Sequence, residues 1–116
     1  MPQRHEHLIR AQENEKLASA LRPKFPVCAD WAITILFYAA LHYIDAFLAG
    51  KNLHPLNHDA RDKQVEQNGS LTDIYHDYRR LKDLSRAARY EIACYPPEAV
   101  EMANGRLARI KEHLGI

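Results

Sequence analysis

The longest apolar stretch of the chain runs from Asp30 to Gly50, and its pattern predicts a buried helix. It is apolar on nearly all sides, and it closes with a glycine, a common residue just past a helix end. About 20 apolar residues would also suffice to span a membrane. Four polar residues interrupt the stretch at spacings of three and four and therefore share one helix face: Thr34, Tyr38, His42 and Asp45. Because ionisable side chains are costly in hydrocarbon, we predict the central helix of a soluble bundle.

The remaining hydrophobic pattern predicts three more long helices and one short helix. The first long helix covers residues 5–22, the third covers 71–95 with an apolar seam at alternating spacings of three and four, and the last begins at Glu98. A short helix is expected over residues 58–67 in the otherwise irregular connection. No strand pattern or repeat appears. The predicted fold is therefore all-α, an up-and-down bundle of four main helices plus a short one, forming a single domain over residues 1–116.

Several residues are typical of helix ends or of helix contacts. Asn57 is a suitable N-cap for the short helix, and Pro26 is placed to open the central one. Ser70 followed three residues later by Asp73 resembles a capping box for the third long helix. Gly105, inside the last helix, predicts close packing against a neighbour.

Composition narrows the functional classes. The chain has 116 residues, enough for one domain with one core, and a net charge of +1, so any nucleic-acid binding has to rest on a local basic patch. The two cysteines lack a CxxC spacing and indicate free thiols in a reducing compartment. The first residues lack the apolar region of a secretory signal. We therefore predict a cytoplasmic protein.

The polar stripe of the central helix is the first candidate site. In one interpretation, Tyr38, His42 and Asp45 form the floor of a binding pocket, with the carboxylate raising the basicity of the histidine. In the other, which the pattern favours slightly, they form hydrogen bonds to neighbouring helices and specify the core.

A second candidate follows the central helix, in the sequence HPLNHDAR. His54 and His58 lie four apart, but Pro55 makes a shared helix face uncertain, and a third metal ligand is missing unless His42 or Asp59 folds over the loop. The pattern therefore favours loop anchoring, or phosphate binding by His58 and Arg61 at the start of the short helix. We predict no metal ligands and no cofactor.

The third candidate is a basic stripe on the helix predicted over residues 71–95. It carries cations at spacings that share one face, with Tyr90 at its border: Arg79, Lys82, Arg86 and Arg89. Arginine beside aromatic rings suits contact with RNA phosphates and bases. The alternative is a solvated face that pairs with nearby carboxylates such as Asp83. If this helix and the central helix are neighbours, the polar stripe, the basic stripe and the histidine loop can share one groove.

Taken in order, these segments resemble the HEPN superfamily of small helical domains. The matching pieces are an interior asparagine in the first helix, the aromatic helix FYAALHYIDAFLAG, the loop HPLNHDAR, the segment LSRAARYE and the last helix PEAVEMANGRLARIKEHL. Within them, Phe37-Tyr38-Ala39-Ala40, His54 with His58, and Arg86 with Tyr90 carry the likeness.

The resemblance implies a helical bundle that often forms homodimers. Many such domains are ribonucleases with an arginine, four to six residues, then a histidine; others accompany a small nucleotidyltransferase or bind nucleotides or RNA. Arg106 and His113 have the ribonuclease spacing, but Leu107 stands where the family usually has a polar residue. The leading prediction is therefore a domain that binds RNA, a nucleotide or a nucleotidyltransferase-type partner, in a toxin–antitoxin or defence pair. The alternative is a metal-independent ribonuclease, with Arg106 and His113 in a composite site across a dimer.

Overall fold

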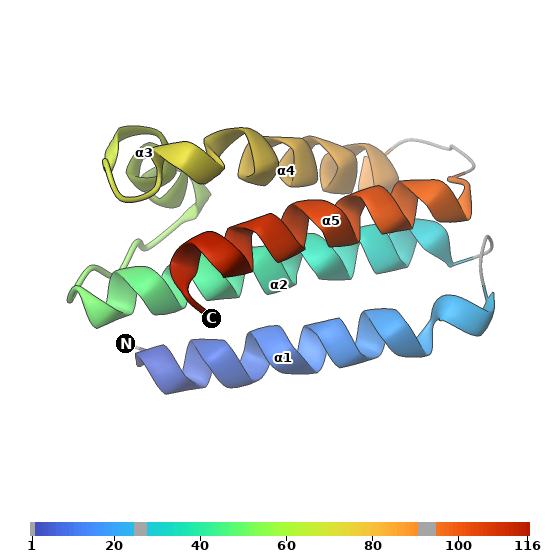
Figure 1. Cartoon of the computed structure of the whole chain (residues 1–116), viewed down its shortest axis with the longest axis horizontal. Coiled ribbons are helices and arrows are strands. Elements are labelled where there is room, and N and C mark those ends of the chain that lie inside the picture. The colour runs from blue at the N-terminus through green and yellow to red at the C-terminus, as the bar shows by residue number, and fades with distance from the viewer. Residues whose placement is uncertain (1, 25–27, 91–94) are drawn as a thin grey trace.

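The protein is a bundle of four antiparallel helices with a fifth, short helix at one end (Figure 1). A computed structural model describes residues 2–24, 28–90 and 95–116. Its helices are α1 (Arg4–Ala20), α2 (Ala29–Gly50), α3 (His58–Gln67), α4 (Tyr75–Tyr90) and α5 (Pro97–Leu114). No strand occurs in these residues. The predicted class, four main helices plus a short one, is confirmed.

Helix α2 is the centre of the bundle, because α1, α4 and α5 all pack against it. On length and composition it could cross a membrane, but 72% of its most apolar window is buried inside the protein. Its largest fully buried side chains include Ile33, Leu36, Phe37, Tyr43 and Ile44. This is the burial expected for the core helix of a bundle, and the other helices cover its apolar sides.

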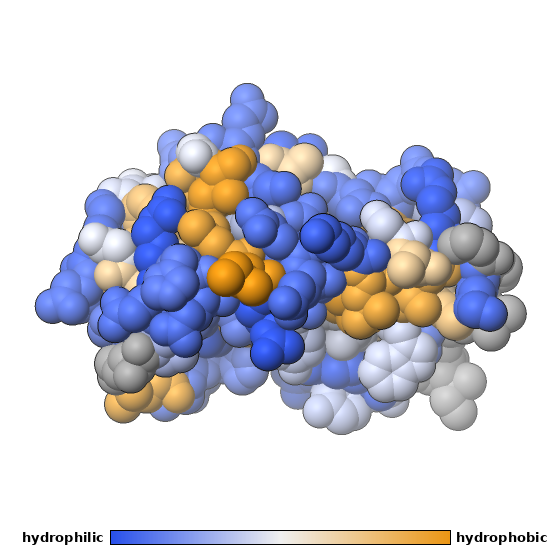
Figure 2. Space-filling view, turned by 90° about the horizontal axis from the view of Figure 1, so that it is seen from below, coloured by the Kyte–Doolittle hydropathy of each residue, from blue (hydrophilic) through white to orange (hydrophobic). Residues whose placement is uncertain are grey.

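Helix α1 covers one side of α2 through small residues, and Ala11 and Ala18 are buried there. Its outer side is polar with apolar interruptions: Ile9 and Leu17 are 53% and 50% exposed. Figure 2, which views the molecule from the α1 side, shows apolar side chains scattered among polar ones. The predicted opening of α2 by Pro26 lies outside the described residues, and α2 begins at Ala29.

Helix α3 is held by the predicted cap, since the Asn57 side chain accepts a hydrogen bond of 2.8 Å from the backbone N–H of Ala60. The capping box predicted for the next helix is absent. Asn68 Oδ1 instead accepts a bond of 3.0 Å from the backbone N–H of Ser70, and the Ser70 hydroxyl contacts Lys51 Nζ. The chain then makes a short 3-10 turn, Thr72–Ile74, before α4 begins.

The helix predicted over residues 71–95 is therefore shorter, with α4 covering Tyr75–Tyr90 and residues 91–94 outside the description. The seam predicted for this helix is buried at Leu71, Ile74, Tyr78, Leu81, Ser85 and Ala88. Its last residue, Tyr95, is only partly buried, and Ile92 lies outside the described residues. Helix α5 begins at Pro97, one residue from the predicted start. The close packing predicted at Gly105 is wrong, because a Cβ built there meets nothing within 4 Å.

Candidate functional site

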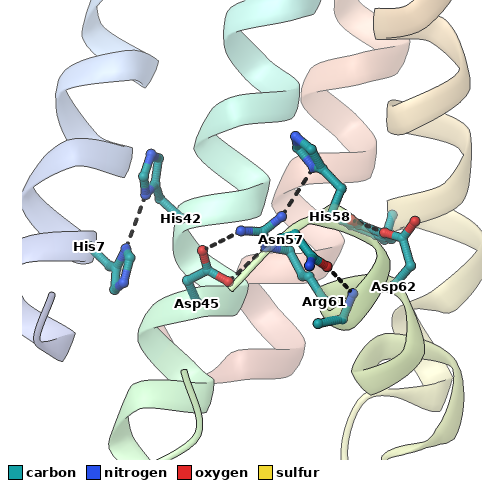
Figure 3. Close-up of polar contacts among 9 residues, drawn as sticks. His7, His42, Asp45, Asn57, His58, Arg61 and Asp62 are labelled. Carbon is teal, nitrogen blue, oxygen red and sulfur yellow. Dashed lines mark hydrogen bonds and ion pairs between the residues drawn. The ribbon is translucent and has the colours of Figure 1, made fainter. Parts of the chain in front are cut away.

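The last three side chains of the polar stripe on α2 each form a hydrogen bond to a different neighbouring helix. Tyr38 accepts a hydrogen bond of 2.9 Å from Arg89 Nη1 of α4. His42 Nδ1 lies 3.1 Å from Nδ1 of His7 on α1, and Asp45 binds Arg61 of α3 (Figure 3). The stripe is thus a row of links between helices, as the structural interpretation of the sequence expected.

The strongest of these links is the ion pair of Asp45 and Arg61. Arg61 donates from Nε to Asp45 Oδ1 at 2.8 Å and from Nη2 to Oδ2 at 2.9 Å. The two side chains are only 9% and 8% exposed. Such two-pronged pairs combine strong hydrogen bonding with a defined orientation. Asp45 therefore anchors α3, whose first turn carries His58, to the bundle.

The same arginine determines the protonation of His58. Arg61 Nη1 lies 3.1 Å from His58 Nδ1. A guanidinium has no acceptor, so Nδ1 must accept and the imidazole proton must sit on Nε2. Partial burial and the charges of Arg61 and Lys82 accordingly lower the pKa of His58. The result is a neutral imidazole whose Nε2–H has no partner among the described residues.

On the other side of Asp45, two histidines meet between α1 and α2. Because both His7 and His42 offer Nδ1 at their 3.1 Å contact, one donates and the other accepts, and at least one ring is neutral. Burial lowers the pKa of both imidazoles, and each ring is influenced by the carboxylate of Asp45. One ligand atom from each of the three side chains lies within 4.8 Å of the others.

A separate, basic groove opens between α2, α4 and the start of α3. It has a volume of about 480 Å³ and is lined by Phe37, His58, Lys82, Arg86, Arg89 and Tyr90. The groove thus brings His58 of the histidine loop together with three cations of the basic stripe. The single groove considered from the sequence would also contain His42 and Asp45 of the polar stripe, and neither lines this one. Tyr38 adjoins it through its bond to Arg89.

The cations of the groove differ in how far they are neutralised. Lys82 is paired with Asp62, and hydrogen bonds from Lys82 and Tyr78 lower the pKa of that carboxyl group against the opposing effect of burial. Among the described residues, Arg86 and Arg89 have no carboxylate partner. Arg89 instead lies over the rings of Tyr38 and Tyr90, at 5.9 and 5.4 Å from their centroids. Within the described residues, two guanidinium charges without a carboxylate partner therefore line the groove.

Exposed aromatic rings lie beside these charges. Tyr90 is 77% exposed and lines the groove. Trp31, 62% exposed, lines an adjoining pocket of about 200 Å³ that also includes Arg89. Aromatic rings with so much solvent exposure contribute little to the core. They leave flat apolar faces available next to Arg89.

Other predicted site residues lie outside the groove. Arg79 is exposed and pairs with Asp83 at 3.5 Å, as the solvated-face alternative expected. His54 lines a different cavity of about 220 Å³, together with His7 and Asp45. Asp45 and Arg61 are buried and His42 turns toward α1. The predicted binding residues are therefore divided between the basic groove and the cluster around Asp45, and Arg79 lies in neither.

The residues of the ribonuclease motif have separate partners. Arg106 Nη1 donates to Asp77 Oδ1 of α4 at 3.1 Å, and Arg109 Nε donates to the same oxygen at 2.9 Å. His113, near the end of α5, lies with Nε2 2.7 Å from the backbone carbonyl oxygen of Ser70. Arg106 thus ties α5 to α4, and this contact gives no support to a catalytic pair.

Sequence reasoning missed three residues of these sites. His7 heads the buried face of α1, and its position there was the available signal. Phe37 is the chain neighbour of Tyr38 and looked like a core residue of the aromatic helix. Trp31 gave no signal, because a single tryptophan at the start of a helix is typical of core residues. No protein-family model, curated protein or solved structure matches this chain. The resemblance to HEPN domains therefore stays a prediction.

Proposed function

We propose that the protein binds single-stranded RNA in the groove between α2, α4 and the start of α3. The observation that carries the proposal is the placement of Arg86 and Arg89 in this groove, without carboxylate partners in the described chain, between exposed aromatic rings. Phosphates would be held by the two guanidinium groups. The net charge of +1 gives no general attraction for RNA, so affinity depends on this local cluster.

Base contact is supported by the aromatic rings on either side of Arg89. Tyr90 and Trp31 present exposed rings to the groove and to the pocket that adjoins it. Stacking of one base on an aromatic side chain contributes about 1–3 kcal/mol and tolerates any sequence. Unstacked bases of single strands can reach such rings, whereas bases inside a duplex cannot. This favours a single strand as the ligand.

His58 adds a neutral donor at the α3 end of the groove. Its Nδ1 is occupied by Arg61, so Nε2–H is the hydrogen-bonding atom that remains. A phosphate or base oxygen at that end can accept from it. The likeness of the LSRAARYE segment to HEPN domains supports the same ligand class, as an analogy between sequences.

The test compares two arginines of α4 that differ in their surroundings. Binding of a fluorescein-labelled, mixed-sequence RNA of about 12 nucleotides, a length within single-strand site sizes, is measured by anisotropy at several salt concentrations. Arg86→Ala removes a groove cation, whereas Arg79→Ala removes an exposed arginine paired with Asp83. We expect Arg86→Ala to weaken binding about tenfold and to reduce the salt dependence. Arg79→Ala should leave both close to wild type.

A second readout locates the RNA on the protein. Trp31 is the sole tryptophan of the chain, and it lies beside Arg89. Titration with unlabelled RNA should therefore change the fluorescence of Trp31. The affinity from this change should equal the affinity from the anisotropy measurement. RNA binding that is absent, or equally sensitive to both arginine variants, would contradict the proposal. Cleavage of the RNA in EDTA, lost in His113→Ala, would favour the ribonuclease alternative instead.

A further inference from the structure

We propose that His7, His42 and Asp45 form a binding site for one divalent transition-metal ion of the zinc type, between α1 and α2. The site is distinct from the basic groove, and the inference does not depend on RNA binding. It rests on the donor set, on the separation of the donor atoms and on an adjoining cavity.

The donor atoms are close to the positions that a metal requires. Two nitrogens that each lie about 2.0–2.1 Å from one tetrahedral zinc are about 3.3–3.4 Å apart. The Nδ1 atoms of His7 and His42 are 3.1 Å apart, and all three donor atoms lie within 4.8 Å of one another. The widest separation has to shorten by at most about 1.4 Å for tetrahedral zinc. Turning one imidazole can supply this change while Asp45 keeps its two bonds to Arg61.

The histidines are also in a suitable chemical state. A metal ion binds the lone pair of a neutral imidazole, and a proton competes with it. At their 3.1 Å contact one Nδ1 donates and the other accepts, so at least one of the two rings is neutral. Within the described part of the chain, the Nδ1 atoms are paired only with each other. Metal binding therefore replaces the one hydrogen bond between them, and the proton of that bond moves from Nδ1 to Nε2 of the same ring, so that both Nδ1 lone pairs face the metal.

Asp45 is oriented for this role by Arg61. Its two oxygens accept one hydrogen bond each from the guanidinium, at 2.8 and 2.9 Å. A carboxylate offers about four lone-pair positions, so each oxygen keeps one for another partner. Hydrogen bonds of this kind commonly fix carboxylate ligands of metals. The arginine also cancels the charge of Asp45, so affinity depends mainly on the two nitrogens and favours zinc over calcium or magnesium.

The cavity beside the cluster provides access and an open fourth position. It has a volume of about 220 Å³, and His7, Asp45 and His54 contribute to its wall. Three protein ligands with a free position toward a cavity are typical of zinc sites that bind water or a substrate.

The experiment uses the full chain without a histidine tag, stripped with EDTA and exchanged into metal-free buffer. Zinc chloride is titrated by calorimetry, and cobalt chloride is added in parallel to record the visible absorption of a tetrahedral site. We expect one equivalent of zinc to bind, with no heat from calcium chloride. His7→Ala and His42→Ala should each weaken zinc binding at least tenfold, whereas His5→Ala, an exposed histidine on the same helix, should not.

Circular dichroism checks that each variant keeps its helical content. His7 is half-buried on the outer helix, so His7→Ala keeps the test decisive even if His42→Ala unfolds. Absence of saturable binding at one equivalent would overturn the proposal. So would equal loss in His5→Ala, or an unchanged affinity in a folded His7→Ala protein. In the last case, His7 and His42 form a hydrogen-bonded pair only.

Discussion

Asp45 and Arg61, which are 16 residues apart in the sequence, are joined by two hydrogen bonds in the interior of the protein. This ion pair lies between the two candidate sites. On one side Arg61 contacts His58, which lines the basic groove; on the other Asp45 lies beside His7 and His42. One salt bridge thus positions side chains for both sites, and it is the first target for mutation.

Breaking this pair should strongly destabilise the protein. Arg61→Met leaves the carboxylate of Asp45 buried without its cation, and such losses typically cost about 3–5 kcal/mol. Adding Asp45→Leu removes the stranded charge, so the double variant should be more stable than Arg61→Met alone. Urea unfolding of the wild type, both single variants and the double variant measures the coupling energy. A double variant that loses the sum of the single effects would show that the two side chains do not interact.

Replacing Gly105, inside α5, and replacing Gly115, at its C-terminal end, with alanine should have opposite effects on stability. A Cβ at Gly105 meets nothing within 4 Å, so Gly105→Ala should stabilise the helix by up to about 1 kcal/mol. Gly115 has a φ of 72°, which alanine adopts only with strain. Gly115→Ala should therefore destabilise the protein by up to about 1 kcal/mol. Thermal melts of the two variants measure both effects, and a lower Tm for Gly105→Ala would contradict the open surroundings of that residue.

Replacing Arg106 with alanine should lower the stability of the protein and leave its affinity for RNA unchanged. Its guanidinium donates to Asp77, and its Nε is buried without a partner among the described residues. Arg106→Ala should cost about 1–3 kcal/mol, because Asp77 keeps only the more exposed Arg109. Urea unfolding gives the cost, and the anisotropy assay gives the affinity. A stable variant with altered RNA binding or cleavage would instead place Arg106 in a functional site.

The stability of the protein should decrease as the pH falls below 6.5, the ordinary pKa of histidine. Burial lowers the pKa of His7, His42 and His58, so the unfolded chain binds protons at a higher pH than the folded chain does. Unfolding takes up protons between 6.5 and the lowered pKa values, so the free energy of unfolding falls over this range and levels off below it.

Unfolding in urea at a series of pH values, with EDTA present, measures this slope. His58→Gln removes one titrating ring while keeping an acceptor for Arg61, so it should flatten the slope. His5→Gln, an exposed histidine, serves as the matched control. Stability that is independent of pH between 6.5 and the acid transition would contradict the lowered pKa values.

The helices were predictable because their signals are local. The apolar run that became α2, the Asn57 cap and the spacing of Leu81, Ser85 and Ala88 depend on neighbours a few residues away. Predictions were wrong where other residues took the hydrogen bonds that a local motif would have made. Ser70 and Asp73 have the capping-box spacing, yet Asn68 and Lys51 take the bonds of Ser70. Gly105 has no neighbour to explain it, and no sequence pattern distinguishes that case from close packing.

By itself, the sequence determined an all-α bundle with a buried central helix and a polar stripe along one face, because periodicity and end signals depend on local spacing. The tertiary structure decided which partner each stripe residue receives. His7 and His42 are 35 residues apart, and Tyr38 and Arg89 are 51 apart. Contacts over such separations depend on which helices are neighbours and how each is rotated about its axis. Those relations exist only after the helices pack, so the division into a basic groove and a histidine–aspartate cluster could be seen only in the folded protein.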